Sequence, residues 1–180
     1  MAGIYTDLRV GIRKAALAAL KEFTNPIVIF SHESGPEPSA SYVVVNILNI
    51  VQQGHHSTST RLSETTETQT IQASYEVMTQ FSFIGSLSGD MSQSFTQRIN
   101  NNCLVFEEMG RNKLGVMRKS QIRRAPQKRD TKWVEYHNTD VTFSYTICTT
   151  QVIDLIEAVI VENQTEPSIF RVPEGPIPSY

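Results

Sequence analysis

The sequence predicts an α+β fold in which an antiparallel or mixed β-sheet is covered by two main helices and carries a protruding β-hairpin arm. Three observations support this prediction. Apolar residues recur at three- and four-residue intervals in two segments, as on the buried face of a helix. Two other segments alternate between apolar and polar residues, as half-buried strands do. The order along the 180 residues is helix, strands, helix, strands, without an internal repeat.

The first predicted element is a helix over residues 4–23, which stops at Asn25-Pro26 because the residue before a proline disfavours the helical conformation. Its apolar stripe consists of Ile4, Leu8, Ile12, Ala15, Ala16, Ala19 and Phe23. A short apolar strand is expected over residues 27–30, and a turn over residues 34–39. The helix is therefore expected to cover a sheet that begins directly after it.

A hairpin is expected next. Residues 42–51 are rich in β-branched side chains and predict a buried strand, whereas residues 52–63 (QQGHHSTSTRLS) predict a polar loop. Residues 71–83 alternate with a period of two and predict a strand with one buried face. Residues 64–70 (ETTETQT) keep β-propensity but have no apolar face. We expect them to extend this strand beyond the core as an arm, with the polar loop at or near its tip. Such a strand often pairs with another chain.

A second helix is expected to begin at Asp90, with Gln93 three residues later as in a capping box, and to run to about residue 109. Its apolar stripe consists of Met91, Phe95, Ile99, Cys103 and Phe106. The run Asn100 to Asn102 has poor helix propensity, so two shorter helices with a break there remain an equal alternative.

The last third of the chain predicts strands over residues 116–122, 141–148 and 152–161, the last of which is also compatible with a helix. Residues 164–180 are rich in proline and predict an extended tail, so residues 1–163 are expected to form a single domain. Phe95 and Phe143 are expected to be buried between helix and sheet.

Motifs and composition argue against an enzyme and against a membrane protein. No stretch approaches the roughly 18 apolar residues of a membrane helix, and charged residues interrupt the N-terminus where a secretion signal would be apolar. Cys103 and Cys148 are expected to be free thiols that pack as small apolar residues. His55 and His56 lack metal-ligand spacing and are expected to be exposed. Neither a nucleophile motif nor a phosphate-binding loop is present, so we expect no catalytic residues, metal or cofactor.

Positive charge is concentrated in residues 111–132. Nine of the 16 Lys and Arg lie there against Asp130 alone, which gives this segment a charge of +8 and the rest of the chain −10. Three interpretations remain open. The segment forms a solvated face, it docks on an acidic face of a neighbouring subunit, or it contacts a nucleic-acid backbone.

Several segments together resemble a known family. These are YVVVNILNIVQQG before a polar loop, VMTQFSFIG leading into DMSQSF, the turn MGRNKLGV, and W-x7-V-T-F-S-Y followed by VIDLIEAVIV. Their order and hydrophobic pattern, over about residues 4–163, resemble the neck and tail-terminator proteins of tailed bacteriophages.

This resemblance implies a virion protein, made in the host cytoplasm, that forms a ring at the end of the tail, and the ring expected from the family is a hexamer. Such a ring terminates the tail tube or sheath, joins the tail to neck and head-completion proteins, and lets DNA pass without sequence-specific binding. Other virion subunits (head completion, sheath or tube) and a nucleic-acid-binding module using residues 111–132 remain alternatives. The residues expected at the interface between subunits are Arg61, Glu64, Glu67, Arg118, Lys119, Arg123, Arg124, Lys128 and Arg129.

Overall fold

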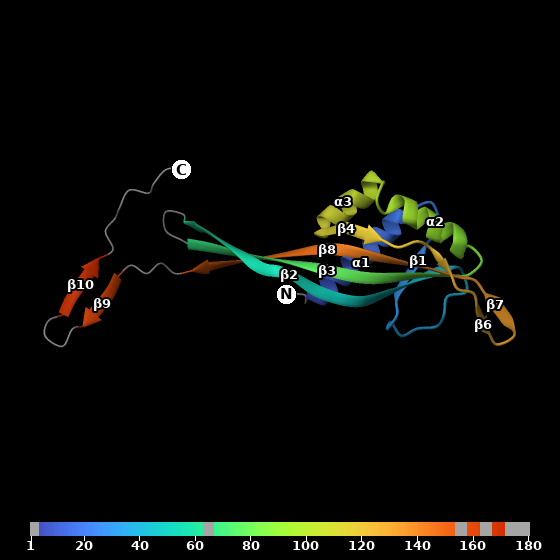
Figure 1. Cartoon of the computed structure of the whole chain (residues 1–180), viewed down its shortest axis with the longest axis horizontal. Coiled ribbons are helices and arrows are strands. Elements are labelled where there is room, and N and C mark those ends of the chain that lie inside the picture. The colour runs from blue at the N-terminus through green and yellow to red at the C-terminus, as the bar shows by residue number, and fades with distance from the viewer. Residues whose placement is uncertain (1–3, 63–66, 154–157, 163–166, 172–180) are drawn as a thin grey trace. The chain divides into compact units, whose positions relative to one another are not determined.

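The computed structural model describes residues 4–62, 67–153, 158–162 and 167–171. The chain divides into two compact units, one of residues 1–56 and 72–147, the other of residues 57–71 and 148–180, and each is described by itself. The elements drawn in Figure 1 are α1 (Ile4–Ala19), β1 (Ile27–Phe30), β2 (Tyr42–Leu62), β3 (Glu67–Ile84), α2 (Ser88–Arg98), α3 (Cys103–Arg111), β4 (Leu114–Lys119), β5 (Arg123–Arg124), β6 (Gln127–Arg129), β7 (Lys132–Val134), β8 (Tyr136–Ile153), β9 (Ala158–Glu162) and β10 (Pro167–Arg171).

The first unit is built on a mixed sheet. Its strands lie in the order β1-β2-β3-β8-β4, and β5 also pairs with β8. Strand β1 runs parallel to β2, whereas β4 and β5 run antiparallel to β8. The pairing of β4 shifts register between Val116 and Arg118, which is a β-bulge. Together with the helices, this sheet confirms the predicted α+β fold class.

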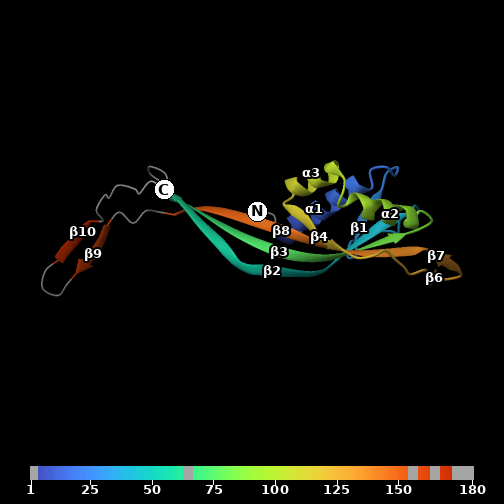
Figure 2. The ribbon, with the colours of Figure 1, turned by 45° about the horizontal axis from the view of Figure 1, so that its top comes forward.

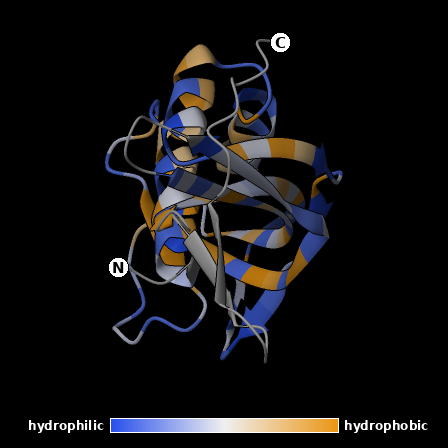
Figure 3. Ribbon diagram, turned by 90° about the vertical axis from the view of Figure 1, so that its left-hand side faces the viewer, coloured by the Kyte–Doolittle hydropathy of each residue, from blue (hydrophilic) through white to orange (hydrophobic). Residues whose placement is uncertain are grey.

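Helices α1, α2 and α3 lie on one face of this sheet (Figure 2). Apolar residues, orange in Figure 3, occur on the helices and on the strands beneath them, and they form one buried cluster. The fully buried members with the largest side chains are Phe81, Phe83, Phe95, Phe143, Leu8, Ile12, Leu20, Met91, Ile99, Met109, Val43 and Val45. Because burial of this apolar surface is the main favourable term in folding, the cluster fastens the helices to the sheet.

Aromatic rings form the centre of the cluster. The ring of Phe95 on α2 lies 4.6 Å from that of Phe81 and 5.4 Å from that of Phe83, measured between centroids. Phe143 on β8 meets Phe81 edge to face at 6.2 Å. Phe95 and Phe143 are both completely buried, which confirms the sequence prediction for these two side chains.

Helix α1 has the predicted stripe but ends earlier than expected. Leu8, Ile12 and Ala19 are completely buried. The helix ends at Ala19 rather than residue 23, and Leu20 closes its last turn with a backbone hydrogen bond to Ala16. The chain then turns before Pro26, which removes the backbone donor that a longer helix would need.

The second helical segment corrects two sequence predictions. Helix α2 begins at Ser88, so Asp90 lies in its first turn and does not cap it. The segment consists of two helices, as the alternative prediction held, because Asn102 accepts hydrogen bonds from the backbone of Leu104 and Val105 and so starts α3. The new start rotates the apolar face: Cys103 and Phe106 are exposed, and Val105 and Met109 are buried in their place.

Residues 52–62 are not a loop, contrary to the sequence prediction, but the second half of strand β2. The threonine and serine residues of this segment favour the extended backbone, and β2 is hydrogen-bonded to its sequence neighbour β3, which satisfies the polar backbone without an apolar face. Gly54 adopts a φ of 65°, a conformation that glycine takes without strain. His55 and His56 are exposed, as predicted.

The backbone just after β3 lies very close to the backbone just before β2. Gly85 has a φ of 110°, and a Cβ atom there would lie 2.9 Å from the Cα atom of Ser41. The Ser41 hydroxyl accepts a hydrogen bond of 3.1 Å from the backbone N–H of Leu87, one residue before α2. Glycine at position 85 therefore allows the entry into β2 and the start of α2 to meet.

The second unit contains polar strand segments and a separate hairpin. Residues of β3 and β8 face each other through side-chain contacts: Gln151 donates to Gln69 at 2.6 Å, and Thr70 and Thr150 lie 3.5 Å apart. Strands β9 and β10 form a two-stranded antiparallel sheet, so the predicted tail contains a strand at Pro167–Arg171. The protruding arm and the domain boundary after residue 163 stay predictions.

We expect Phe95→Ala and Phe143→Ala each to lower the free energy of unfolding by about 3–5 kcal/mol, because each removes a large side chain from a close-packed cluster. Urea denaturation followed by circular dichroism measures this change. Phe106→Ala is the matched control, since Phe106 is 48% exposed, and it should cost less than about 1 kcal/mol. A loss below about 1 kcal/mol for Phe95→Ala would contradict the packing.

Candidate assembly surface on the open sheet face

The sheet of the first unit has one face without a helix in the described part of the chain (Figure 2). Side chains alternate along each strand, so the neighbours of the buried core residues point to this face. We call it the open sheet face. Its residues are Leu48 and Ile50 on β2, Glu76, Met78 and Gln80 on β3, and Asp140 and Thr142 on β8. Leu48, Ile50 and Met78 are exposed apolar side chains.

A first row of polar contacts crosses the open sheet face from β2 to β4. Glu76 accepts a hydrogen bond of 2.9 Å from Gln53 and pairs with Arg118 through its other carboxylate oxygen. The Arg118 Nε–H also donates to the hydroxyl of Thr142 at 3.1 Å, and Thr142 is buried. One arginine therefore joins three strands.

A second row lies further along the same strands. Asp140 accepts a hydrogen bond of 3.4 Å from Gln80 and forms a salt bridge of 2.5 Å with Arg123. Arg123 is half exposed, whereas Asp140 is mostly covered. Exposed ion pairs of this kind contribute at most about 1 kcal/mol, so their main effect is to neutralise the face.

A third group closes one end of the same face. The Tyr42 hydroxyl donates to Glu37 at 2.6 Å, and Arg129 pairs with the same carboxylate while its guanidinium lies over the ring of Tyr136. The hydrogen bond from Tyr42, followed by Arg129, lowers the pKa of Glu37. Burial and the neighbouring Glu37 raise the pKa of Tyr42 to about 12.

The structure places most of the predicted interface residues on exposed strands. Arg61 is exposed on β2 and Glu67 is partly buried on β3, whereas Glu64 lies outside the described residues. The predicted interface residues that belong to the first unit are all exposed. They are Arg118 and Lys119 on β4, Arg123 and Arg124 on β5, and Lys128 and Arg129 on β6. Their role at an interface stays a prediction.

The excess of positive charge in residues 111–132 is partly neutralised in the folded structure. Five of the nine cations of residues 111–132 pair with carboxylates outside that segment: Arg111 with Glu107 and Glu108, Arg118 with Glu76, Arg123 with Asp140, Arg124 with Glu135, and Arg129 with Glu37. Lys119 donates to the backbone carbonyl of Thr96 at 2.6 Å. Sequence reasoning missed these carboxylates, although the period of two already placed Glu76 and Asp140 on the face opposite the core.

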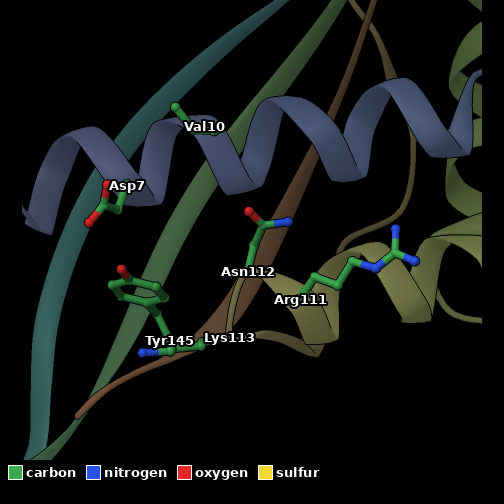
Figure 4. Close-up of a pocket in the computed structure, with 6 residues that line it drawn as sticks. All are labelled: Asp7, Val10, Arg111, Asn112, Lys113 and Tyr145. Carbon is green, nitrogen blue, oxygen red and sulfur yellow. The ribbon is translucent and has the colours of Figure 1, made fainter. Parts of the chain in front are cut away.

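A separate cavity of about 230 Å³ lies beside α1 (Figure 4). It is lined by Asp7, Val10, Arg111, Asn112, Lys113 and Tyr145. Burial, and then the charge of Asp7, raises the pKa of Tyr145, which stays a neutral phenol at neutral pH. Arg111 is already engaged by two glutamates, and the lining lacks a nucleophile with an adjacent base.

Other candidate chemistry is similarly sparse in the described residues. Within them, no group of His, Cys, Asp and Glu is arranged to hold a metal ion. His137 Nδ1 lies 3.0 Å from the hydroxyl of Ser88, but Ser88 is completely buried and this contact is structural. Cys103 and Cys148 are free thiols and are exposed, so their predicted packing is wrong. Of the described helices, none combines the length and the apolar character needed to span a membrane.

The free energy of unfolding should fall at alkaline pH because the Tyr42 hydroxyl loses its proton. Its folded-state pKa of about 12 exceeds the ordinary value of 10.0, so the folded protein holds the proton more tightly than the unfolded chain. This contribution is fully present below about pH 10 and is lost as the pH rises to about 12. Urea unfolding across this range should show a shallower decline for Tyr42→Phe than for the wild type. The exposed Tyr5→Phe control should keep the wild-type decline, and equal slopes for Tyr42→Phe and the wild type would contradict the assignment.

Within the described residues, exposed apolar side chains and paired charges share the open sheet face, and the cavity beside α1 holds no nucleophile with an adjacent base. Comparison with curated proteins finds no match for the chain. The sequence model of one family, described as "Phage neck terminator protein", matches residues 14–167, which is most of the chain and includes both polar rows. The chain therefore belongs to the phage neck terminator family and is a structural protein of the virion neck and tail.

Proposed function

We propose that the protein forms a ring, most simply a hexamer, that terminates the phage tail and joins it to the neck. The observation that carries this proposal is the family match over residues 14–167. The ring contacts the tail tube, the sheath where one is present, and the neck or head-completion proteins. DNA passes through its channel without sequence-specific binding.

The open sheet face supports a role in assembly. It combines exposed Leu48, Ile50 and Met78 with two rows of polar contacts. Each row contains one ion pair, Glu76–Arg118 or Asp140–Arg123, in which the two charges neutralise each other. A surface of this mixed character, with few net charges and some apolar area, is typical of protein–protein interfaces. An enzyme would instead need convergent acid, base or nucleophilic groups, and the described residues bring none together at an accessible site.

The nucleic-acid alternative loses support from the same contacts. Phosphate binding needs Lys and Arg that are free to replace counterions. All five arginines in residues 111–132 are instead paired with carboxylates, as described above. The remaining alternatives within the virion are a sheath, tube or head-completion subunit.

The mass of the purified protein in solution tests the ring. Light scattering of the concentrated protein should give six times the 20.2 kDa of one chain. The protein is also mixed with tail tubes from the phage that encodes it. Electron microscopy of the tubes should then show a closed ring at one end, and tubes without the protein should lack it. A protein that stays monomeric at every concentration and leaves added tubes bare would rule out the terminator ring.

A further inference from the structure

The second unit contains segments of three neighbouring strands. They are residues 57–62 of β2, residues 67–71 of β3 and residues 148–153 of β8. The strand order places β3 between β2 and β8. Residues 67–71, which belong to the strand that the sequence predicts to pair with another chain, are therefore already flanked on both sides. The outer segments, on β2 and β8, instead each have one side of the backbone that a further strand can join.

The described residues place no strand on the outer side of either outer segment. On one side of the sheet, β1 pairs with β2 only over residues 42–45. On the other side, β4 pairs with β8 over residues 141–145, and one further backbone bond of 3.2 Å joins the N–H of Thr146 to the carbonyl of Lys113. Within the described part of the chain, β2 after residue 45 and β8 after residue 146 thus each have an unpaired edge.

Both edges lack the features by which proteins usually prevent strand addition. Natural edge strands are very short, or they carry lysine, proline or inward-pointing charges. Residues 57–62 (STSTRL) contain one charge, that of Arg61, and residues 148–153 (CTTQVI) contain none. Proline is absent from both segments, and both contain threonine, which favours an extended backbone. A strand of another molecule can therefore pair with either edge.

The two outer strands run in the same direction. β2 and β3 are joined by residues 63–66, and so short a connection requires antiparallel strands, because a parallel pair needs a dozen or more residues. β3 and β8 are also antiparallel, since Gln69 contacts Gln151 and the next residue, Thr70, contacts the preceding one, Thr150. β2 and β8 are therefore parallel to each other, with β3 between them.

A second copy of the chain fits this arrangement. The two outer segments, residues 57–62 and 148–153, have the same length, so one edge can cover the other completely. Copies related by rotation about one axis keep the direction of their strands along that axis, so β8 of one copy meets β2 of the next in parallel. Two different strands form this contact, and repeating such a contact gives a closed ring when the rotation allows it.

We propose that the free edge of β2 in one copy pairs in parallel with the free edge of β8 in the next copy, over residues 57–62 and 148–153. The three-stranded segments of all subunits then join into one sheet that runs around the ring. This proposal rests on the ring proposed above and names the surfaces that connect its subunits. Main-chain hydrogen bonds supply the affinity in strand addition of this kind. Arg61, one of the predicted interface residues, lies within the contact.

Cys148 is an exposed thiol on the free edge of β8, so disulfide formation can test the contact. Neighbouring strands lie about 4.8 Å apart, which is within the Cα separation of a disulfide. Within one copy, β3 separates β2 from β8, and the distance of about 10 Å across two strand spacings is too long for a disulfide. A disulfide between a cysteine in residues 57–60 and Cys148 therefore reports on two copies.

The cysteines are introduced one at a time in a Cys103→Ser background, which removes the other thiol. The variants are Ser57→Cys, Thr58→Cys, Ser59→Cys and Thr60→Cys. Successive side chains point to opposite faces, so either positions 57 and 59 or positions 58 and 60 should cross-link, but not both pairs. Mild oxidation should then give a ladder up to the hexamer on a non-reducing denaturing gel. Adding Cys148→Ser should abolish this ladder, and the Cys103→Ser protein should remain a single chain.

Lysine substitutions test the same edges without a covalent bond. Ser59→Lys combined with Thr149→Lys adds one positive charge to each exposed edge, as natural edge strands do to avoid pairing. Association measured by light scattering should weaken about tenfold or more. Ser34→Lys combined with Ser39→Lys is the matched control, because it adds the same charge at exposed positions of the first unit and should leave association unchanged. Equal weakening by both pairs would contradict edge pairing.

Amide hydrogen exchange identifies any other strand that occupies the β2 edge. Every second N–H of residues 57–62 points to the free side, and its exchange should be slower in the assembled protein than in the monomer. Slower exchange that requires added tail tubes, without cross-links between copies, would assign this edge to a strand of the tube and overturn the proposal.

The outcomes separate this contact from the ring itself. A hexamer that none of the four cysteines cross-links would overturn the edge pairing and leave the ring intact. A Cys148-dependent ladder from open chains, with closed hexamers absent, would support the pairing and contradict the ring. Disulfide-linked dimers of the Cys103→Ser protein would indicate that two β8 edges meet about a two-fold axis and would overturn the proposal. Absence of association even on tail tubes would overturn both.

Discussion

Strands β3 and β8 can each direct only every second side chain towards the helices, and the rest of the first unit depends on this constraint. Phe81, Phe83 and Phe143 all point to the side where α2 places Phe95, and the four rings fasten the helices to the sheet. The same alternation sends the intervening residues to the opposite face. The open sheet face is thus a direct consequence of the core. Its polar rows occupy positions that the helices cannot cover.

The parts of the fold that could be predicted are those governed by local sequence pattern. Alternation located β3 and the central part of β8, and the stripe of Leu8, Ile12 and Ala19 located α1. The sequence predictions were wrong where the local residue pattern favoured one structure and backbone hydrogen bonding in the folded chain produced another. Residues 52–62 lack an apolar face, yet pairing with β3 keeps them extended. Asp90 is a good capping residue by type, but α2 begins two residues earlier.

The candidate surface was less predictable than the fold, because its contacts join residues far apart in the chain. Glu76 and Arg118 are 42 residues apart in sequence, and Glu37 and Arg129 are 92 apart. A charge count along the sequence therefore found nine cations against a single acid, but it could not show that folding brings carboxylates to Arg118, Arg123, Arg124 and Arg129, or that Arg111 pairs with two glutamates of its own helix. The free edges of β2 and β8 were equally hidden, since they depend on which strands lie side by side.

The contact between Gly85 and Ser41 restricts how this chain can vary. Because a Cβ at position 85 would lie 2.9 Å from the Ser41 Cα, and because φ there is 110°, no other residue type fits without moving backbone. Ser41 is constrained as well, since its hydroxyl accepts from the residue before α2. Drift in the sequence should therefore be slow at these two positions and faster at the exposed residues 34–36. An insertion at this junction would shift the start of β2 relative to the start of α2. Insertions and deletions should therefore be tolerated elsewhere in the chain but not here.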